Sequence, residues 1–507
     1  MWSDEYHKVH RNTLRHDLQS NAREWTSDYW KQKANIAIKD RLQSGCSGHG
    51  AKRARNVVLF LGDGMSVPTL AAARTLLGQR DHRTGEEAQL SFENFPTVGL
   101  AKTYCVDAQI ADSACTATAY LCGVKTNLGT IGVNAAVPRG DCPASADSAT
   151  HVESIGAWAL ADGRDAGIVT TTRVTHASPA GAYAHVANRD WESDVDVLND
   201  SHDPQTCPDI AYQLVHSYPG NEFKVILGGG RREFIPNDTI DEEGSAGKRV
   251  DGRNLIEEWQ MDKISKNVSY QYLWNREQLL NVNENLPEYL LGLFEGSHMQ
   301  YHLEADARTE PTLAELTETA IRSLSRNDKG FFLFVEGGRI DHAHHDNKVA
   351  KALDETIELS KAVSRATELL SEEDSLIVVT SDHAHVMSFS GYTHRGGDIL
   401  GPSDEVGDDG IPYMTLSYAN GPGYRPHTPE GRFDVMKDEN YGDVNWVSPA
   451  GVPLQQETHG GDDVAVFARG PQHALFAGLY EQSHIPRFLA YAACIGPGPH
   501  ACQHDTA

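Results

Sequence analysis

The sequence contains no long apolar run, no paired-cysteine zinc motif and no basic stripe, and each absence excludes a class of protein. No segment approaches the ~18 apolar residues of a membrane span, and the start MWSDEYHKVH lacks the basic and apolar parts of a signal peptide. We therefore expect a cytosolic chain or one trimmed from a longer precursor. A formal net charge of −27 over 507 residues argues against nucleic-acid recognition and fits a soluble, secreted protein.

The eight cysteines include no CxxC pair, which argues against a structural zinc knuckle and favours disulfides. Cys494 and Cys502 bracket a Pro/Gly-rich stretch that a disulfide could close. Cys115 and Cys122 fall on an expected helix and are expected to be buried thiols. Three glycosylation sequons are also present, at Asn199, Asn237 and Asn267. Together these features favour an oxidising, extracellular setting.

Short apolar runs alternate with helical patterns from about residue 55 to 235, and again from 312 to 380. This alternation predicts an α/β fold, with a large, mostly parallel central sheet and helices on both faces. The expected segments are a helical arm at 1–45, the main domain at 46–500, insertions at about 232–312 and 391–457, and a tail at 501–507.

Acids and histidines stand at or just beyond the ends of the expected strands. They are Asp63, Glu336, Asp341, His345, Asp382, His383 and His459. Singly, such an aspartate is more often a helix cap and such a histidine a packing group. Ligands gather outside the carboxyl ends of parallel strands, so the whole set predicts a polynuclear metal site. His344 and His385 lie in the same motifs. For these two histidines the alternatives to a ligand role are plain packing and support of a metal ligand.

The spacing of these residues suits zinc. Asp341 and His345 are four residues apart, so a helical turn would put both on one face, and His459 would complete an Asp/His/His set. Asp63, Asp382 and His383 could hold a second zinc. Two ions about 3.5–4 Å apart clamp the attacking and leaving oxygens of an in-line displacement. The predicted chemistry is therefore phosphoryl transfer.

Ser113 begins an expected helix in ADSACTATAYLCG, where unpaired N–H groups and the helix dipole favour a phosphate. Its alternative role is a helix N-cap. A hydroxyl bound to zinc would ionise without a histidine base, and this makes Ser113 the candidate nucleophile.

The motif THASPAGAYAHVANRDW adds Ser178 and Arg189. Ser178, Asp63 and Glu336 form an oxygen-only set that suits magnesium. Arg189 offers the planar fork that grips two phosphate oxygens, and its alternative is a surface ion pair with Asp190 or Glu192.

LGDGM, DSACTATAYLCGVKT, THASPAGAYAH, FFLFVEGGRIDHAHH, SDHAH and ETHGGDDVAVFARGP occur in the order found in the alkaline phosphatase family, which the chain resembles from about 55 to 500. The resemblance implies phosphate monoester hydrolysis of broad specificity at alkaline pH, through a phosphoserine intermediate. It implies a zinc ion on Asp341, His345 and His459, a second on Asp63, Asp382, His383 and Ser113, magnesium on Asp63, Ser178 and Glu336, and Arg189 on the phosphate.

His176 and His342 stand where bacterial members tend to carry Asp or Lys, so the chain is similar to the animal branch. By this resemblance both support the metal centre, and His176 lies near the substrate. Animal members are typically secreted, glycosylated homodimers on a glycolipid anchor. The resemblance makes 391–457 a dimer-facing crown and sends Tyr392 to the partner's active site. It places a calcium ion on Phe294 (backbone), Glu295, Glu310 and Glu242, and disulfides at Cys142–Cys207 and Cys494–Cys502.

The chain also departs from the family. Cys115 takes a place beside the nucleophile that usually holds a smaller residue, and the resemblance gives no partner to Cys46, Cys105, Cys115 or Cys122. The chain stops without the apolar tail of an anchor signal, so anchoring is implied by the family alone. Phosphodiesterases and sulfatases share the two-metal core, but Ser113 and the third metal set favour monoesters. A surface receptor or an inactive homologue is the non-enzyme alternative. The complete ligand set argues against an inactive homologue, whereas a receptor role could coexist with activity.

Overall fold

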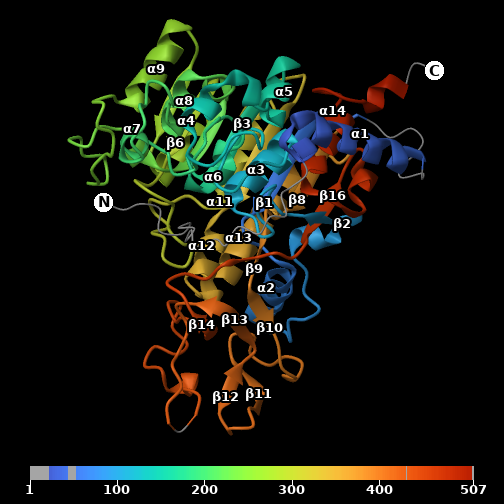
Figure 1. Ribbon diagram of the computed structural model, residues 1–507, viewed down its shortest axis with the longest axis vertical. Helices are drawn as coiled ribbons and strands as arrows, with labels where there is room; N and C mark the ends of the chain where they lie inside the picture. Colours follow the sequence, from blue (N-terminus) through green and yellow to red (C-terminus); the bar gives the residue numbers. More distant parts are fainter. Residues whose placement is uncertain (1–21, 44–52, 430, 505–507) are drawn as a thin grey trace.

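The computed structural model describes residues 22–43, 53–429 and 431–504, and within them ten strands form one sheet (Figure 1). In spatial order the strands are β17 (Gly478–Glu481), β2 (Thr97–Lys102), β16 (Val464–Arg469), β8 (Ser375–Thr380), β1 (Asn56–Gly62), β7 (Phe331–Gly337), β3 (Asp165–Arg173), β4 (Val225–Gly229), β6 (Tyr289–Leu293) and β5 (Tyr270–Leu273). β16 pairs antiparallel with both of its neighbours, and the other pairings are parallel. The predicted mostly parallel sheet is confirmed.

The middle of the sheet explains why the candidate residues converge. All residues of β1, β7 and β8 are buried, as expected for central parallel strands covered on both faces. In the register of β1 with its neighbours, Leu61 lies beside Glu336 on one side and Thr380 on the other. Asp63 and Asp382 therefore follow directly at the same carboxyl edge.

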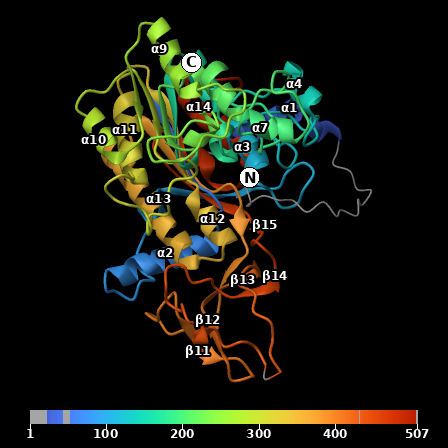
Figure 2. The ribbon, with the colours of Figure 1, turned by 90° about the vertical axis from the view of Figure 1, so that its left-hand side faces the viewer.

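Helices cover both faces of the sheet (Figure 2). The longer ones are α1 (Ser27–Gln43), α2 (Val67–Arg80), α3 (Ser113–Cys122), α9 (Leu255–Ser265), α11 (Leu313–Leu324), α13 (Val349–Leu369) and α14 (Ile485–Ala493). The shorter ones are α4 (Cys142–Ala146), α5 (Ile155–Ala161), α6 (Ala177–Ala180), α7 (Asp194–Asn199), α8 (Ile210–His216), α10 (Arg276–Val282) and α12 (Arg339–His345). Figure 2 shows α2, α11 and α13 on one side of the sheet and α1, α3 and α14 on the other, and each side has its own large apolar cluster.

The segment 232–312 differs from the predicted insertion. It contains β5 and β6, which extend the central sheet beyond β4. The run Tyr289–Leu293 is buried at every position, although it is short and lies among polar residues. Burial of this run against β4 is why the segment continues the sheet instead of leaving it.

The segment 391–457 contributes to two small sheets that project from one end of the molecule (Figure 1). One contains β10 (Met387–Phe389), β13 (Leu416–Gly421) and β14 (Ala450–Pro453), and the other contains β11 (Pro402–Val406) and β12 (Pro412–Met414). At their base, β9 (Ala384–His385) pairs antiparallel with β15 (His459–Gly460). This short ladder joins the two ends of the projection to the candidate metal residues.

The described part of the N-terminal arm packs on the main domain. In α1, Trp30, Ala34 and Ile38 are buried at four-residue spacing, and Lys33 Nζ lies 2.8 Å from Glu481 Oε1. The remainder of the predicted arm at 1–21, together with Cys46 and residues 505–507, lies outside the described residues. Among the described residues, no helix has the length and apolar character needed to span a bilayer.

The cysteines follow the predictions only in part. Cys142 and Cys207 form a disulfide, as the resemblance implies, and Cys122 is a buried free thiol. The expected disulfide between Cys494 and Cys502 is not present: both are free, and the Cys502 amide donates to Cys494 Sγ at 3.1 Å. This stretch is therefore closed by a hydrogen bond after Cys494 ends α14 in a left-handed conformation, at φ 60°.

Candidate metal centre

The first metal set lies between α12 and the β9–β15 ladder. His345 Nε2 and His459 Nε2 are 3.1 Å apart, and each is 3.4 Å from a carboxylate oxygen of Asp341. His345 Nδ1 donates to the carbonyl oxygen of Glu457 at 2.6 Å, and His459 Nδ1 donates to that of Ala111 at 2.7 Å. These backbone contacts fix the tautomers, so both Nε2 lone pairs point at one position, as in metal-binding histidines.

His385 supports this set. Its Nε2 is 2.6 Å from Asp341 Oδ1, and its Nδ1 contacts the carboxylate of Glu457. Burial alone would lower the pKa of His385, but Glu457 and Asp341 raise it to about 10. Of the two roles left open for His385, support of a ligand is therefore the one its contacts favour. Glu457 opens the motif ETHGG but was not predicted as a site residue.

The second set lies where β1, β8 and α3 meet. His383 Nε2 is 3.0 Å from Asp382 Oδ2, 3.6 Å from Asp63 Oδ1 and 3.2 Å from Ser113 Oγ. Asp382 Oδ1 accepts the amide of Gly64 at 2.9 Å, which directs its other oxygen toward the histidine. Four side chains from three distant segments of the sequence therefore face one point.

The third set shares Asp63 with the second. Ser178 Oγ donates to Asp63 Oδ2 at 3.1 Å, so the two oxygens of Asp63 face different sets. Glu336 accepts the hydroxyls of Thr170 and Thr172 through Oε2. These two threonines on β3 were not predicted, although their alternate positions and nearness to the end of an apolar run are the signal that could have found them.

The electrostatics of these sets fit bound cations. Asp63, Glu336, Asp341 and Asp382 are all fully buried within one small region. Burial raises the pKa of Asp63 well above its usual range, and Asp382, Asp341 and Glu336 add to the rise. Asp63 Oδ1 and Glu336 Oε1 also have no hydrogen-bond partner in the described structure. Buried carboxylates with unused oxygens need compensating charge, which metal ions supply.

Ser113 is the first residue of α3 and is fully buried. The N-cap is Asp112, whose Oδ1 accepts the amide of Cys115 at 3.1 Å, so the alternative role of Ser113 as N-cap is wrong. The hydroxyl of Ser113 instead faces His383. Asp112 was missed, although an aspartate directly before an expected helix is itself a capping signal.

Arg189 also points into this centre and does not form the alternative surface pair. It is 2 % exposed, and its NH1 is 3.2 Å from Asp112 Oδ2. Glu192 pairs with Arg173 and Asp190 pairs with Arg139. Burial would raise the pKa of Asp112, but Arg189 and Arg139 hold it below its usual value. The guanidinium is thereby fixed beside the N-terminus of α3.

His176 and His342 lie next to this arginine, together with a third histidine. His176 Nε2 is 3.3 Å from Arg189 NH2, and the rings of His176 and His342 are 5.4 Å apart. His298, which was not predicted, packs 4.3 Å from His342 and 2.6 Å from the guanidinium of Arg173. The surrounding arginines disfavour a further cation among these histidines.

The residues implied for calcium come from three loops: Phe294 and Glu295 directly follow β6, Glu310 precedes α11, and Glu242 precedes α9. Gln300 donates its amide N–H to Glu310 at 2.8 Å and its side-chain N–H to Glu295 at 2.9 Å. Burial, followed by the charge of Glu295, raises the pKa of Glu310 to about 9, and Glu243 adds to the rise. Glu242 lies 3.7 Å from Arg231.

Phe294 directly follows β6 and is buried, and its amide donates to the carbonyl oxygen of Gly228 on β4. The resemblance implied Glu242, and its neighbour Glu243 lies 3.1 Å from Arg231 and contributes to the raised pKa of Glu310. Neighbouring residues in a turn point in different directions, so sequence position alone could not choose between them.

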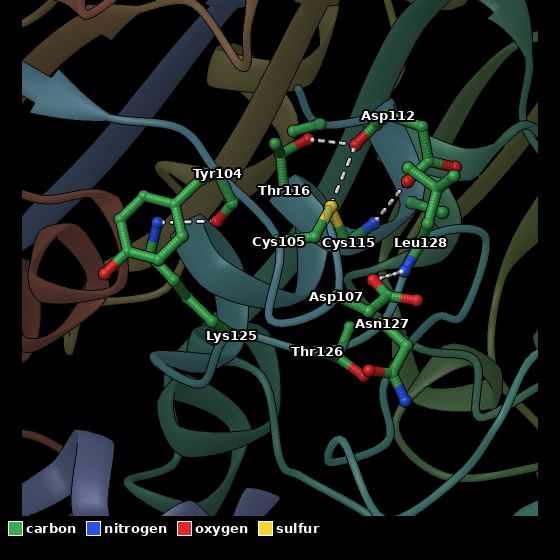
Figure 3. The surroundings of a disulfide bond; sticks show 12 residues. Tyr104, Cys105, Asp107, Asp112, Cys115, Thr116, Lys125, Thr126, Asn127 and Leu128 are labelled. Atoms are coloured by element: carbon green, nitrogen blue, oxygen red, sulfur yellow. Dashed lines mark hydrogen bonds between the residues drawn. A yellow bond between two sulfur atoms is a disulfide. The ribbon is translucent and has the colours of Figure 1, made fainter. Parts of the chain in front are cut away.

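A disulfide beside the candidate nucleophile Ser113 was not predicted. Cys105 and Cys115 are joined, which corrects the expectation that Cys115 is a free thiol. Figure 3 shows the bond next to Asp112 and Thr116, whose hydroxyl donates to the Asp112 carbonyl at 3.0 Å. The disulfide ties the first turn of α3 to the segment after β2, and Asp112 and Ser113 lie inside the loop that it closes.

Removal of this bond is expected to destabilise the protein. In the chain-entropy account, a cross-link that closes a loop of this size contributes about 2–3 kcal/mol. Replacing both Cys105 and Cys115 by Ala should lower the free energy of unfolding by that amount in urea denaturation. The matched control is Cys122→Ala, which removes a buried thiol without removing a cross-link. A double variant as stable as the wild type would show that the bond contributes nothing.

The fold and this centre define a class of protein. An open α/β sheet with clustered buried acids, histidines, a serine and an arginine at its carboxyl edge is the arrangement of a metal-dependent hydrolase of phosphate esters.

Known proteins agree with this class. The family model for alkaline phosphatase matches residues 54–495. The membrane-bound alkaline phosphatase of Bombyx mori is 63% identical over 483 residues, which cover 95% of this chain and 88% of that protein. The tissue-nonspecific isozyme of alkaline phosphatase from Homo sapiens is 46% identical over 474 residues, which cover 92% of this chain and 88% of that protein. The chain therefore belongs to the alkaline phosphatase family, a metal-dependent family, and hydrolyses phosphate monoesters.

Solved structures support the fold. The alkaline phosphatase of a psychrophilic Shewanella aligns with a TM-score of 0.60 at 24% identity, over 86% of this chain and 99% of that one. The alkaline phosphatase of the Antarctic bacterium TAB5 aligns with a TM-score of 0.59 at 20% identity, over 88% of this chain and 100% of that one.

Proposed function

We propose that the chain hydrolyses phosphate monoesters of broad specificity at alkaline pH through a phosphoserine on Ser113. The observation that carries this proposal is the convergence of Ser113 Oγ with His383, Asp63 and Asp382. The oxygen of Ser113 forms a bond to phosphorus as the bond to the alcohol breaks, and the alcohol leaves with a proton. Water then attacks the phosphoserine, which releases inorganic phosphate and restores the hydroxyl.

The surrounding residues orient the phosphoryl group. Arg189 presents a planar pair of donors, and Asp112 holds its guanidinium in place. Ser113 begins α3, so the first amides of this helix face the same phosphate. His176 contacts Arg189, and this contact supports a place for it next to the substrate. These groups act on the charge that develops on the transferred phosphoryl oxygens.

The donor types support specific metals. We assign zinc to Asp341, His345 and His459, a second zinc to Asp63, Asp382 and His383 with Ser113, and magnesium to Asp63, Ser178 and Glu336. Mixed nitrogen and oxygen donors suit zinc, and an oxygen-only set suits magnesium. When bound, such ions supply positive charge for the attacking and leaving oxygens. A calcium ion would be held by Glu295, Glu310 and the backbone of Phe294, with Glu242 or its neighbour Glu243.

The test of this function is hydrolysis of a chromogenic aryl phosphate monoester, compared with the matching diester, from neutral to alkaline pH. Zinc and magnesium are supplied in both assays. Turnover of the monoester that rises toward alkaline pH supports the proposal. A preference for the diester would make the chain a phosphodiesterase, and an optimum below neutrality would contradict the proposed pH dependence.

Arg189→Ala is expected to lower kcat/KM for the aryl phosphate by about 10- to 100-fold, mainly through KM, because a bidentate contact to phosphate is lost. Arg189→Lys should lose less, since it keeps the charge but not the fork. Steady-state kinetics measure both. The control is Arg322→Ala, an exposed arginine paired with Glu318 on α11. Equal kinetics of Arg189→Ala and wild type would remove Arg189 from the phosphate site.

The setting is proposed from the same family. We propose an extracellular homodimer on the cell surface, attached through a glycolipid anchor, and the relative in Bombyx mori is named membrane-bound. Tyr392 is 85 % exposed, as a residue that reaches a partner's active site would be in an isolated chain. The three sequon asparagines, Asn199, Asn237 and Asn267, are exposed and accessible to glycosylation.

A further inference from the structure

The disulfide between Cys105 and Cys115 closes a loop whose ends are 10 residues apart in the sequence. Residues 103–112, all within the described part of the chain, form no helix or strand between β2 and α3. The side chains of Gln109 and Ile110, near the middle of the loop, are exposed. The shape of the loop therefore depends on its two ends and on side-chain contacts, because no ladder of backbone hydrogen bonds supports it.

Two consecutive residues of this loop orient groups of the metal centre. The carbonyl oxygen of Ala111 accepts His459 Nδ1 at 2.7 Å, which directs Nε2 of this histidine toward the first metal set. Asp112 Oδ2 accepts Arg189 NH1 at 3.2 Å, and Asp112 Oδ1 accepts the amide of Gly129 at 3.1 Å. The carbonyl oxygen of Gly129 in turn accepts the amide of Arg189 at 2.8 Å. A shift of the loop would therefore disturb His459 and Arg189 together.

The next residue, Ser113, is the candidate nucleophile, and its Oγ lies 3.2 Å from His383 Nε2. Cys115 lies in the same first turn of α3, and its amide donates to Asp112 Oδ1 at 3.1 Å. The disulfide thus links the turn that carries Ser113 directly to the segment after β2 (Figure 3). Attack on phosphorus depends on the place of the attacking oxygen, and a displacement of about 1 Å can cost about 100-fold in rate.

Hydrogen bonds also hold the Cys105 end of the loop. The amide of Val106 donates to the carbonyl oxygen of Thr126 at 3.0 Å, and Asp107 Oδ1 accepts the amide of Leu128 at 2.8 Å. Such bonds near the surface open and re-form in local fluctuations, whereas a covalent bond does not. The disulfide is therefore the contact that persists through these fluctuations.

The burial of the disulfide distinguishes a permanent link from a redox switch. Cys105 and Cys115 are each 2 % exposed, and they pack with Ala111 in a small apolar cluster. Thiol–disulfide exchange requires access of a thiolate to a sulfur atom, which this burial restricts. The bond is therefore suited to hold one arrangement of the loop permanently.

We propose that the disulfide between Cys105 and Cys115 positions Ser113 and Arg189 for turnover, in addition to stabilising the fold. This positioning role rests on the proposed phosphoserine function. Both cysteines are positioning residues, because they act through the loop and the first turn of α3. Without the bond, the loop samples more arrangements, and fewer of them place the serine oxygen in line with the phosphorus–oxygen bond that breaks.

The first test variant is Cys105→Ala, which breaks the bond without changing any residue of α3. Single-turnover stopped flow of the metal-loaded full chain, with saturating enzyme over a chromogenic aryl phosphate, follows release of the alcohol. We expect the rate constant of this step to fall at least about tenfold. The limiting rate constant at saturating enzyme does not depend on what fraction of the protein is folded, so lost stability alone would leave it unchanged.

A second variant, Cys105→Ala/Cys115→Ala, also removes the thiol left on α3 and should show the same fall, and either variant carries the test if the other does not fold. The matched control is Cys142→Ala/Cys207→Ala, which removes a disulfide of sequence separation 65 between α4 and the segment before α8. Its longer loop makes this control the more destabilising change in the chain-entropy account. Its rate constant should nevertheless equal that of the wild type.

Wild-type rate constants in the Cys105 variants, or an equal fall in the control, would overturn the positioning role while the wild type still traps phosphate on Ser113 in rapid quench. A wild type that releases the alcohol but traps no phosphate would overturn the proposed function, and the positioning role with it. The trapped phosphate therefore distinguishes the two failures.

Discussion

Ser113→Ala is expected to lower kcat for an aryl phosphate by at least about 10³-fold, because the phosphoserine can no longer form. The substitution removes one oxygen from a fully buried position. Asp112, which caps α3, and Arg189, which pairs with Asp112, remain in place. The phosphate should therefore still bind, and the loss should fall on kcat more than on KM.

The control for this variant is Ser323→Ala, a serine that is 6 % exposed on α11. It should keep wild-type kinetics, which separates loss of the nucleophile from loss of a buried hydroxyl in general. A rapid-quench experiment with a labelled phosphate ester should trap phosphate on the wild type and none on Ser113→Ala. A Ser113→Ala variant that turns over at the wild-type rate would contradict serine catalysis.

Much of the centre could be predicted because its residues follow local patterns. A buried strand is visible as an apolar run, and the residue after it is fixed in sequence, so Asp63 and Asp382 could be expected at one edge of a parallel sheet. The helical spacing of Asp341 and His345 is equally local, and α12 spans both. The sheet itself followed from the alternation of such runs with helices.

Contacts set by tertiary packing could not be predicted. Spacing does not determine which cysteines pair, so the bond between Cys105 and Cys115 was missed and the one between Cys494 and Cys502 was wrongly expected. Glu457 contacts His385 only because β9 and β15 lie side by side.

Packing also decided the extent of the sheet. The strand Tyr289–Leu293 is too short an apolar run to be distinguished from a loop without β4 beside it.

Removal of metal by dialysis against a chelator is expected to abolish hydrolysis and to lower Tm by on the order of 10 °C. A bound ion whose free concentration is 1,000 times its Kd contributes about 4 kcal/mol to the free energy of unfolding, and two such ions contribute about twice that. The physical cause is the group of buried acids Asp63, Glu336, Asp341 and Asp382, which repel one another without cations. Zinc and magnesium together should restore both activity and Tm.

The metal content and the Tm are readouts that do not depend on turnover. His345→Ala removes one ligand of the first set, so this variant should retain about one zinc per chain fewer and show a smaller Tm shift on chelation. The matched control is His216→Ala, whose partly exposed histidine pairs with Glu258 away from the centre. It should show the full shift, since its metal ligands are intact. A chelated wild type that keeps its Tm, or equal zinc content in both variants, would contradict a metal centre built on Asp341, His345 and His459.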